Sequence, residues 1–470
     1  MTVRQLLIKR LGALPVIRTY LERLQLKERV DALAPVREVA HLTNGEVVEA
    51  LIANRLTAPR PLYDIVAWAE GWAVEETFGI APTDLNDDRL GRCLDEIAAV
   101  HDGVRGALTV QALTAFGLET TALRWDLTSV LVTGAYPDEE QATDYAQVSY
   151  GYSSGRQKQI RYLQVTTDDG AVPVWDAPYD GNTTDVATVI DTMHALREHA
   201  GCQDFVLIGD SKLLSEPNRR ALLSAEIGYL APLARTPELD AAFLAIPPEE
   251  LVPLAYISER ERNLAPEEQT HYLGAERMLQ VSVPERQGGH QRRSVRQGFV
   301  VSSEERAACR RNRARQRERA EAEIFGVLGR VGTRWYPTAE RAAAKIETIL
   351  EHRHRDAKGP LRIRPLFVTS NRRIVGLVTI LGLALLVFSL IEREARRALA
   401  PGAKVPNLLA GHVAARPTGD NLFKALRDIA LVTFDLAGVR QQHVADFTPL
   451  QRSLLPLLSV PDAAYTRLNS

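Results

Sequence analysis

Hydrophobic and polar residues alternate along several stretches between residues 119 and 213, and this period of two predicts β-strands. The first stretch is 122–133 (ALRWDLTSVLVT). Two more, IRYLQVTT and AVPVWDAP, flank an Asp-Gly turn at 168–170 that is typical of a β-hairpin. A helix is expected from Asp185 to about residue 200, and the strand FVLIGD follows it. Three strands, a helix and a fourth strand predict a mixed α/β sheet.

Residues 1–118 have the apolar spacing of helices instead. Thr43 and Glu46 form a capping-box pattern before VVEALIANRL, and Asn86 stands where it can cap the helix DDRLGRCLDEIAAV. We therefore expect a helical N-terminal domain. Either a DNA-binding or dimerising unit or a plain helical scaffold fits this pattern, since no helix in it is marked by basic residues.

Prolines interrupt the region 214–345, which we expect to be an insertion laid over the sheet. Its stretch QVSVPERQGGHQRRSVRQGFVVSS predicts a hairpin with a Gly-Gly turn. Ser302 and Glu305 then form a capping pattern before a strongly basic helix. The resulting division is 1–118 for the helical N-terminal domain, 119–213 for the first part of the sheet domain, 214–345 for the insertion, and 346–470 for the last part of the sheet domain.

The 18 residues at 374–391 (IVGLVTILGLALLVFSLI) carry no charge. That length is at the short limit for a membrane-spanning helix, and a membrane-anchored protein is one reading. A helix that is apolar on every side also suits the centre of a large globular domain. Because two glycines, a threonine and a serine reduce its hydrophobicity, we expect a buried core helix and no membrane partner.

Composition and charge narrow the class of protein. The chain has 470 residues, 45% of them hydrophobic and 25% charged, which is enough for about three globular units at roughly 150 residues each. Its three cysteines are far apart, so a disulfide framework and a zinc knuckle are not indicated and a reducing compartment is expected. The formal charge of −2 conceals a basic block at 291–373, with 21 basic and 9 acidic residues, that would attract a polyanion or form a solvated helix.

Two aspartates stand at strands of the expected sheet. Asp126 lies within the first strand, and Asp210 ends the fourth. If these strands are neighbours, the two carboxylates converge on a hard divalent cation such as Mg²⁺, whose chemistry in proteins includes phosphoryl transfer. The pair therefore indicates a nuclease-type enzyme.

Five motifs together resemble one family: NDDRL at 86–90, WDLTSV at 125–130, IGDSK at 208–212, EHRHRDAKGPL at 351–361 and SNRR at 370–373 before the apolar helix. The chain resembles the DDE transposases of bacterial insertion sequences, in the group with a Tyr, Arg, Glu, Lys signature at the third acid. The resemblance implies a ribonuclease H-like α/β fold with a helical N-terminal domain. It also implies an insertion between the second Asp and the Glu helix.

The resemblance further implies that Asp126, Asp210 and Glu351 bind Mg²⁺ or Mn²⁺ and form the catalytic set. Lys358 would hold a phosphate near the transposon end, since it lies two helical turns after Glu351 on the same face. Further DNA contacts are expected from Arg353, Arg355, Arg311 and Arg315. The implied activity is cleavage at transposon ends followed by strand transfer to target DNA. A homodimer would pair the ends, at the nucleoid in the bacterial cytoplasm.

The third-acid motif departs from the family pattern. With Glu351 as the acid, the signature's Arg and Tyr fall at Glu347 and Ala344. The chain therefore looks internally shortened just before Glu351, near residues 346–350. An alternative hypothesis follows, in which the protein is a catalytically inactive remnant that binds DNA only.

Overall fold

The structure is a computed structural model that describes residues 3–132, 145–151, 158–232, 242–258, 261, 264–284, 290–302, 370–436 and 439–469. These residues form two compact units. The larger unit holds the described residues within 1–218, 227–231 and 344–470, and the smaller unit holds those within 219–226 and 232–343.

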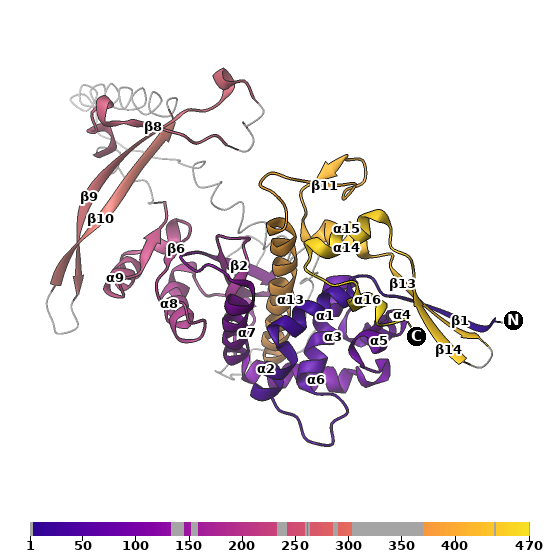
Figure 1. Cartoon of the computed structure of the whole chain (residues 1–470). Helices are drawn as coiled ribbons and strands as arrows, with labels where there is room; N and C mark the ends of the chain where they lie inside the picture. The colour runs from indigo at the N-terminus through magenta and orange to yellow at the C-terminus, as the bar shows by residue number, and fades with distance from the viewer. Residues whose placement is uncertain are drawn as a thin grey trace, which may run out of the picture. The chain divides into compact units, whose positions relative to one another are not determined.

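A six-stranded sheet is the centre of the larger unit, in the order β3-β4-β2-β6-β7, with β5 also paired to β4 (Figure 1). Its strands are β2 (Ala122–Leu131), β3 (Ser149–Tyr150), β4 (Lys158–Thr167), β5 (Pro173–Tyr179), β6 (Val206–Ile208) and β7 (Gly228–Leu230). β4 is antiparallel to both β2 and β5, whereas β6 and β7 run parallel to β2. This order and these directions confirm the expected ribonuclease H-like sheet.

The local chemistry of the sheet follows the sequence pattern. Trp125, 2% exposed, alternates along β2 with the half-buried Asp126, so the two side chains point to opposite faces. The β4–β5 hairpin closes at Gly170, whose φ of 81° is one that glycine adopts without strain. Short helices connect the later strands: η3 (Asp185–Ala187), α8 (Thr188–Glu198), η4 (Ser211–Leu214) and α9 (Glu216–Ser224).

Helices make up most of the N-terminal part of the larger unit. They are α1 (Leu14–Leu24), α2 (Leu26–Leu33), α3 (Asn44–Thr57), η1 (Leu62–Asp64), α4 (Ile65–Gly71), α5 (Val74–Phe78), η2 (Pro82–Asp84), α6 (Asp87–Ala99) and α7 (His101–Phe116). The predicted caps are confirmed: Thr43 and Glu46 form a capping box at α3, and Asn86 accepts a hydrogen bond from the Arg89 amide at α6.

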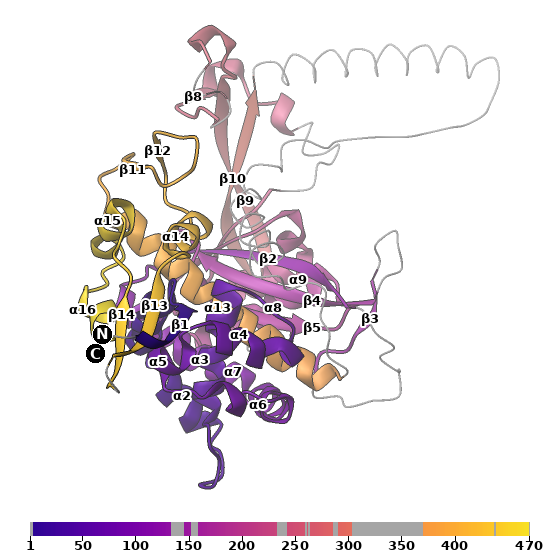
Figure 2. The same cartoon turned by 90° about the vertical axis from the view of Figure 1, so that its right-hand side faces the viewer.

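The first residues differ from the expected helical pattern. They form a strand, β1 (Val3–Arg10), that pairs antiparallel with β13 (Ala430–Leu436), which in turn pairs with β14 (Val439–Val444). Figures 1 and 2 both show the two chain ends beside this small sheet. The expectation of helix throughout 1–118 is wrong here because a partner more than 400 residues away determines the conformation.

The apolar segment forms α13 (Asn371–Arg397), and residues 374–391 are buried along their whole length. It is the one helix in the described part of the chain that is long and apolar enough to cross a membrane. α13 packs against α3, α6, α7 and β5, and Figure 1 shows α8 on the other side of the sheet. At its end, the 2%-exposed Arg393 donates to the carbonyl oxygens of Phe116 and Gly117, which lie at the end of α7. The helix thus behaves as the core helix that the sequence predicted.

The remaining C-terminal elements add no strand to the six-stranded sheet among the residues that the structure describes. They are β11 (Val405–Pro406), β12 (Ala414–Ala415), α14 (Gly419–Leu426), α15 (Pro449–Leu457) and α16 (Ala463–Thr466). The segment after α13 instead packs with the N-terminal helices, for example through α16 against α1.

The smaller unit is built on a long antiparallel hairpin of β9 (Tyr272–Pro284) and β10 (His290–Ser302), joined at its edge by β8 (Val252–Leu254). Two single turns, η5 (Pro248–Glu250) and η6 (Pro266–Glu268), precede it. Its core is Ile246, Leu251 and Ala275, with Phe243, Leu273 and Phe299 packed around them. The strands of the predicted hairpin are therefore confirmed, whereas the Gly-Gly turn and the basic helix after Ser302 lie outside the described residues.

Candidate active site

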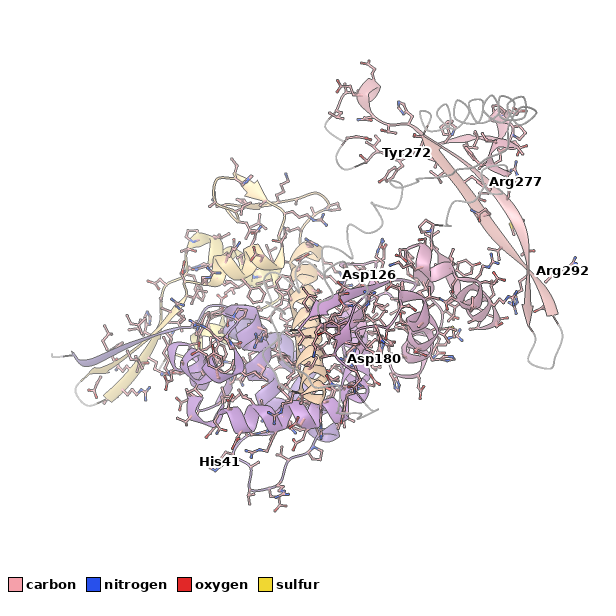
Figure 3. The ribbon with its side chains drawn as sticks, turned by 180° about the vertical axis from the view of Figure 1, so that it is seen from behind. His41, Asp126, Asp180, Tyr272, Arg277 and Arg292 are labelled. Atoms are coloured by element: carbon pink, nitrogen blue, oxygen red, sulfur yellow. The ribbon has the colours of Figure 1, made fainter. Side chains whose placement is uncertain are left out.

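Asp126 and Asp210 come from neighbouring strands. β2 and β6 are parallel, with Arg124 aligned to Ile208. One residue further along, the Cβ position of Gly209 lies 3.2 Å from the Trp125 ring, so the alignment continues past the last paired residues. Continued by one more residue, this alignment sets Asp126 beside Asp210. Neighbouring positions on adjacent strands share a face of the sheet, and the charge of Asp126, labelled in Figure 3, acts on the Asp210 carboxyl, so the two carboxylates lie near each other.

The electrostatics of Asp210 agree with that placement. Its partial burial raises the pKa of the carboxyl, and the negative charges of Asp185 and Asp126 raise it further. The backbone amide of Lys212 acts in the opposite direction, since it donates to Asp210 Oδ1 at 2.9 Å. An acid whose neighbours are also acids favours a cation beside it, because a bound cation removes the mutual repulsion.

A third acid near Asp210, Asp185, is held between two cations. Its side chain is 14% exposed, and its two carboxylate oxygens pair separately with Arg161 and Lys212. Arg161 is fixed in turn by donating to Ser129 Oγ at 2.9 Å. The network therefore fixes the half-exposed Lys212 ammonium close to Asp210, where it can meet an anion.

The donors around Asp126 suit a hard divalent cation. Gln164 is the cross-strand neighbour of Asp126 and so shares its face of the sheet. This side chain is 1% exposed, and neither of its amide atoms has a hydrogen-bond partner among the described residues. Two carboxylates and an unused amide oxygen are ligands of the type that Mg²⁺ takes. No group of three or more acidic, histidine or cysteine side chains that could hold a metal occurs in the described part of the chain.

The other predicted site residues cannot be placed. Glu351 and Lys358 lie outside the described residues, and so do Arg353, Arg355, Arg311 and Arg315. The substituted signature positions, Ala344 and Glu347, fall in the same region. Their roles therefore stay predictions.

Sequence reasoning missed the part that Asp185 and Arg161 play. Asp185 stands at the start of a helix, where an acid is ordinarily explained by the helix dipole. Arg161 lies in an alternating strand, where it resembles a solvent-facing residue. The signal that was available is the position of Asp185 in the connection that leads from β5 to β6, the strand that is followed two residues later by Asp210.

Two family models match the chain. One, described as "Transposase DDE domain", matches residues 125–386, which is more than half of the 470 residues. The other, described as "Domain of unknown function (DUF4277)", matches residues 6–104. None of the curated proteins matches.

Solved structures similar to this chain include the piggyBac transposase synaptic complex with hairpin DNA. The identity is 9% and the TM-score 0.38, over 97% of this chain and 84% of that one. The Mos1 transposase paired-end complex with left transposon end is similar at 10% identity and a TM-score of 0.18, over 43% of this chain and 62% of that one.

Proposed function

Because the chain belongs to the Transposase DDE domain family, we propose that it cleaves DNA at the ends of an insertion sequence and joins the freed strand to target DNA. The single observation that supports this chemistry most directly is the placement of Asp126 on β2 and of Asp210 just past the end of β6, its parallel neighbour. Rigid strands are suitable supports for acids that must hold a cation in a fixed position.

In this proposal Asp126 and Asp210 ligate the divalent ions, Mg²⁺ or Mn²⁺, and Glu351 completes the set. Bound divalent ions supply a Lewis acid for phosphoryl transfer and stabilise charge on the attacking and leaving oxygens. Asp185 positions Lys212, through the ion pair between them, so that the ammonium faces the DNA backbone beside the two acids. Its positive charge would offset the negative charge of an approaching phosphate.

DNA is the proposed partner along the basic block. Lys358, Arg353 and Arg355 would contact phosphates beside Glu351, and Arg311 and Arg315 would contact the backbone from the insertion. A homodimer would hold two transposon ends together, since two-fold symmetry matches two identical ends.

A strand-nicking assay tests the proposal. We expect the protein to cut duplex DNA that contains its own transposon ends when Mg²⁺ or Mn²⁺ is present, and to lose this activity with EDTA. Asp126→Ala and Asp210→Asn should each abolish cutting. Asp204→Asn is the matched control, because Asp204 is an exposed acid at the opposite end of β6.

Two results would contradict it. Cutting that survives Asp126→Ala would show that another group, or a contaminant, does the chemistry. Binding to the ends without any metal-dependent cutting would favour the inactive, DNA-binding remnant. A Glu351→Gln variant extends the test to the third acid, and unchanged activity there would remove Glu351 from the metal set.

A further inference from the structure

A groove of about 940 Å³ opens on the larger unit, between its N-terminal and C-terminal segments. Arg10, at the end of β1, lines one side, together with Lys424 of α14 and Arg427 just after it. Arg60 and Tyr63, after the end of α3, line the other. A second hollow of about 650 Å³ shares Arg10, Arg60 and Arg427 with it and continues along β1. The two hollows therefore form one continuous surface feature.

Positive charge predominates in this groove. Five basic side chains and three acidic ones line the two hollows: Lys9, Arg10, Arg60, Lys424 and Arg427 against Asp64, Asp420 and Asp428. Lys9 is buried and paired with Glu76, which leaves four accessible cations. Arg10 and Arg427 are exposed, and neither forms an ion pair with a residue in the described ranges. Unpaired arginines on a concave surface are the ordinary means of holding phosphate.

Two of the three paired cations in the groove, Arg60 and Lys424, are held only weakly, whereas the buried Lys9 pairs with Glu76 at 2.8 Å. Arg60 lies 3.0 Å from Asp64, and Lys424 lies 2.6 Å from Asp420, with both basic side chains more than half exposed. Exposed pairs of this kind contribute about 0–1 kcal/mol each. A phosphate could therefore replace the carboxylate at little cost.

Buried hydrogen bonds hold the backbone around these cations in place. The amides of Leu11 and Gly12, directly after Arg10, both donate to the carbonyl oxygen of Ile429 at 2.9 Å. The buried Tyr465 hydroxyl donates to the carbonyl oxygen of Gly12, also at 2.9 Å. The strand end that carries Arg10 and the turn after Arg427 are thus tied together, which limits the entropy lost when a ligand binds.

The opposite side of the groove is fixed in the same way. The buried Asn54 side chain accepts from the Arg60 amide at 3.2 Å, and Arg55 Nη2 donates to the Arg60 carbonyl oxygen at 2.8 Å. Nearby, Tyr63 is 76% exposed, so its hydroxyl is free to reach a ligand. Tyrosine and arginine both contact phosphate and sugar in protein–DNA interfaces.

We propose that this groove binds the phosphate backbone of duplex DNA through Arg10, Arg60, Lys424 and Arg427, as a second DNA contact separate from the acidic pair. It would assign a role to residues within 6–104, the part matched by a family model of unknown function. The inference rests on the proposed function for the choice of DNA as the partner. It does not depend on catalysis, because none of the groove residues belongs to the Asp126 and Asp210 site.

Binding measured by fluorescence anisotropy tests this proposal. The probes are a labelled duplex with a transposon end and an unrelated duplex of equal length, in EDTA, at several salt concentrations. For Arg10→Gln/Arg427→Gln, we expect weaker binding to both duplexes by the same factor, because phosphate contacts carry no base information. Each phosphate contact contributes about 0.9 to the slope of log affinity against log salt, so the slope should become shallower by about 1.8.

The control is Arg440→Gln/Arg452→Gln, which removes two exposed arginines that do not line the groove. Lys424→Gln/Arg427→Gln is a second groove variant that leaves β1 untouched, for use if the first variant does not fold. An unchanged salt slope in the folded groove variants would overturn the proposal. A loss confined to one of the two duplexes would also overturn it, since that result indicates base recognition.

The two proposals fail separately. Metal-dependent cutting by the wild type together with unchanged binding by the groove variants would leave the catalytic proposal standing and remove the groove. If the wild type binds DNA through the groove in a salt-dependent way but never cuts it, the groove proposal stands and the catalytic proposal fails. Duplex DNA that the wild type does not bind in EDTA would refute the groove whatever the outcome of the cutting assay.

Discussion

The buried ion pair between Arg105 of α7 and Asp176 of β5 provides a quantitative test of how the core helix is held. Arg105 Nε lies 2.9 Å from Asp176 Oδ2, and Arg105 Nη2 donates to Thr379 Oγ1 of α13, also at 2.9 Å. The Arg105 side chain is 2% exposed and that of Asp176 is 8% exposed. One guanidinium therefore joins a helix, a strand of the central sheet and the apolar helix behind it.

Asp176→Ala should destabilise the larger unit strongly. It leaves the buried Arg105 charge with only the half-exposed Asp102 carboxylate, at 3.6 Å, and the loss of one partner from a buried pair costs about 3–5 kcal/mol. The exposed pair of Arg60 and Asp64 is the matched comparison, because Asp64→Ala removes a contact that contributes about 0–1 kcal/mol. Replacing both buried partners, in Arg105→Leu/Asp176→Leu, should recover much of the loss because neither position then leaves a buried charge without its partner.

Urea unfolding followed by tryptophan fluorescence is the suitable assay, since four of the five tryptophans belong to the larger unit. The expected order of stability is wild type and Asp64→Ala together, then the double leucine variant, then Asp176→Ala. If Asp176→Ala unfolds at the same urea concentration as Asp64→Ala, the pair does not hold these elements together and the reasoning is refuted.

Three further predictions concern other positions. Burial raises the pKa of Glu49 from 4.5 to about 7, so the folded state loses stability as pH rises through that range. Glu49→Gln should therefore stabilise the protein by up to about 3 kcal/mol at pH 8 and not at pH 4, and equal shifts in melting temperature at both pH values would contradict this. The Asp185 charge, added to partial burial, raises the pKa of Asp210, so Asp185→Asn should move the acidic limb of the pH–cleavage profile to lower pH. If that limb does not move, the Asp185 charge does not act on the group that titrates there. A Cβ on Gly376 would clash with the Leu94 carbonyl oxygen of α6, so Gly376→Ala should cost about 1–3 kcal/mol by denaturation, whereas Gly71→Ala, in open space, should cost less than that.

Local signals in the sequence were sufficient for much of the fold. The Asp-Gly turn at 168–170 predicted the hairpin of β4 and β5, because glycine supplies the positive φ that the turn needs. Thr43 and Asn86 marked helix starts through hydrogen bonds made within three residues. The apolar run at 374–391 predicted a buried helix from composition alone. Each of these features depends on residues close together in the chain.

Features that depend on distant partners were not predictable in this way. β1 contains a helix-compatible sequence, and only pairing with β13 makes it a strand. Asp126 and Asp210 were identified as acids at strands, but their alignment depends on the register between β2 and β6, which no local pattern specifies. Asp185 was assigned to a helix start because its two cationic partners, Arg161 and Lys212, lie 24 and 27 residues away.

The pairing of β1 with β13 affects how a newly made chain matures. The ribosome produces β1 first and reaches its partner more than 400 residues later, which at roughly 5–20 residues per second is a wait of about 20–80 s. During that interval the strand presents an unpaired backbone edge, which invites association with other nascent chains. Translation products that stop before residue 430 never close this edge, so we expect gene copies with a late stop codon to yield protein that aggregates or is degraded.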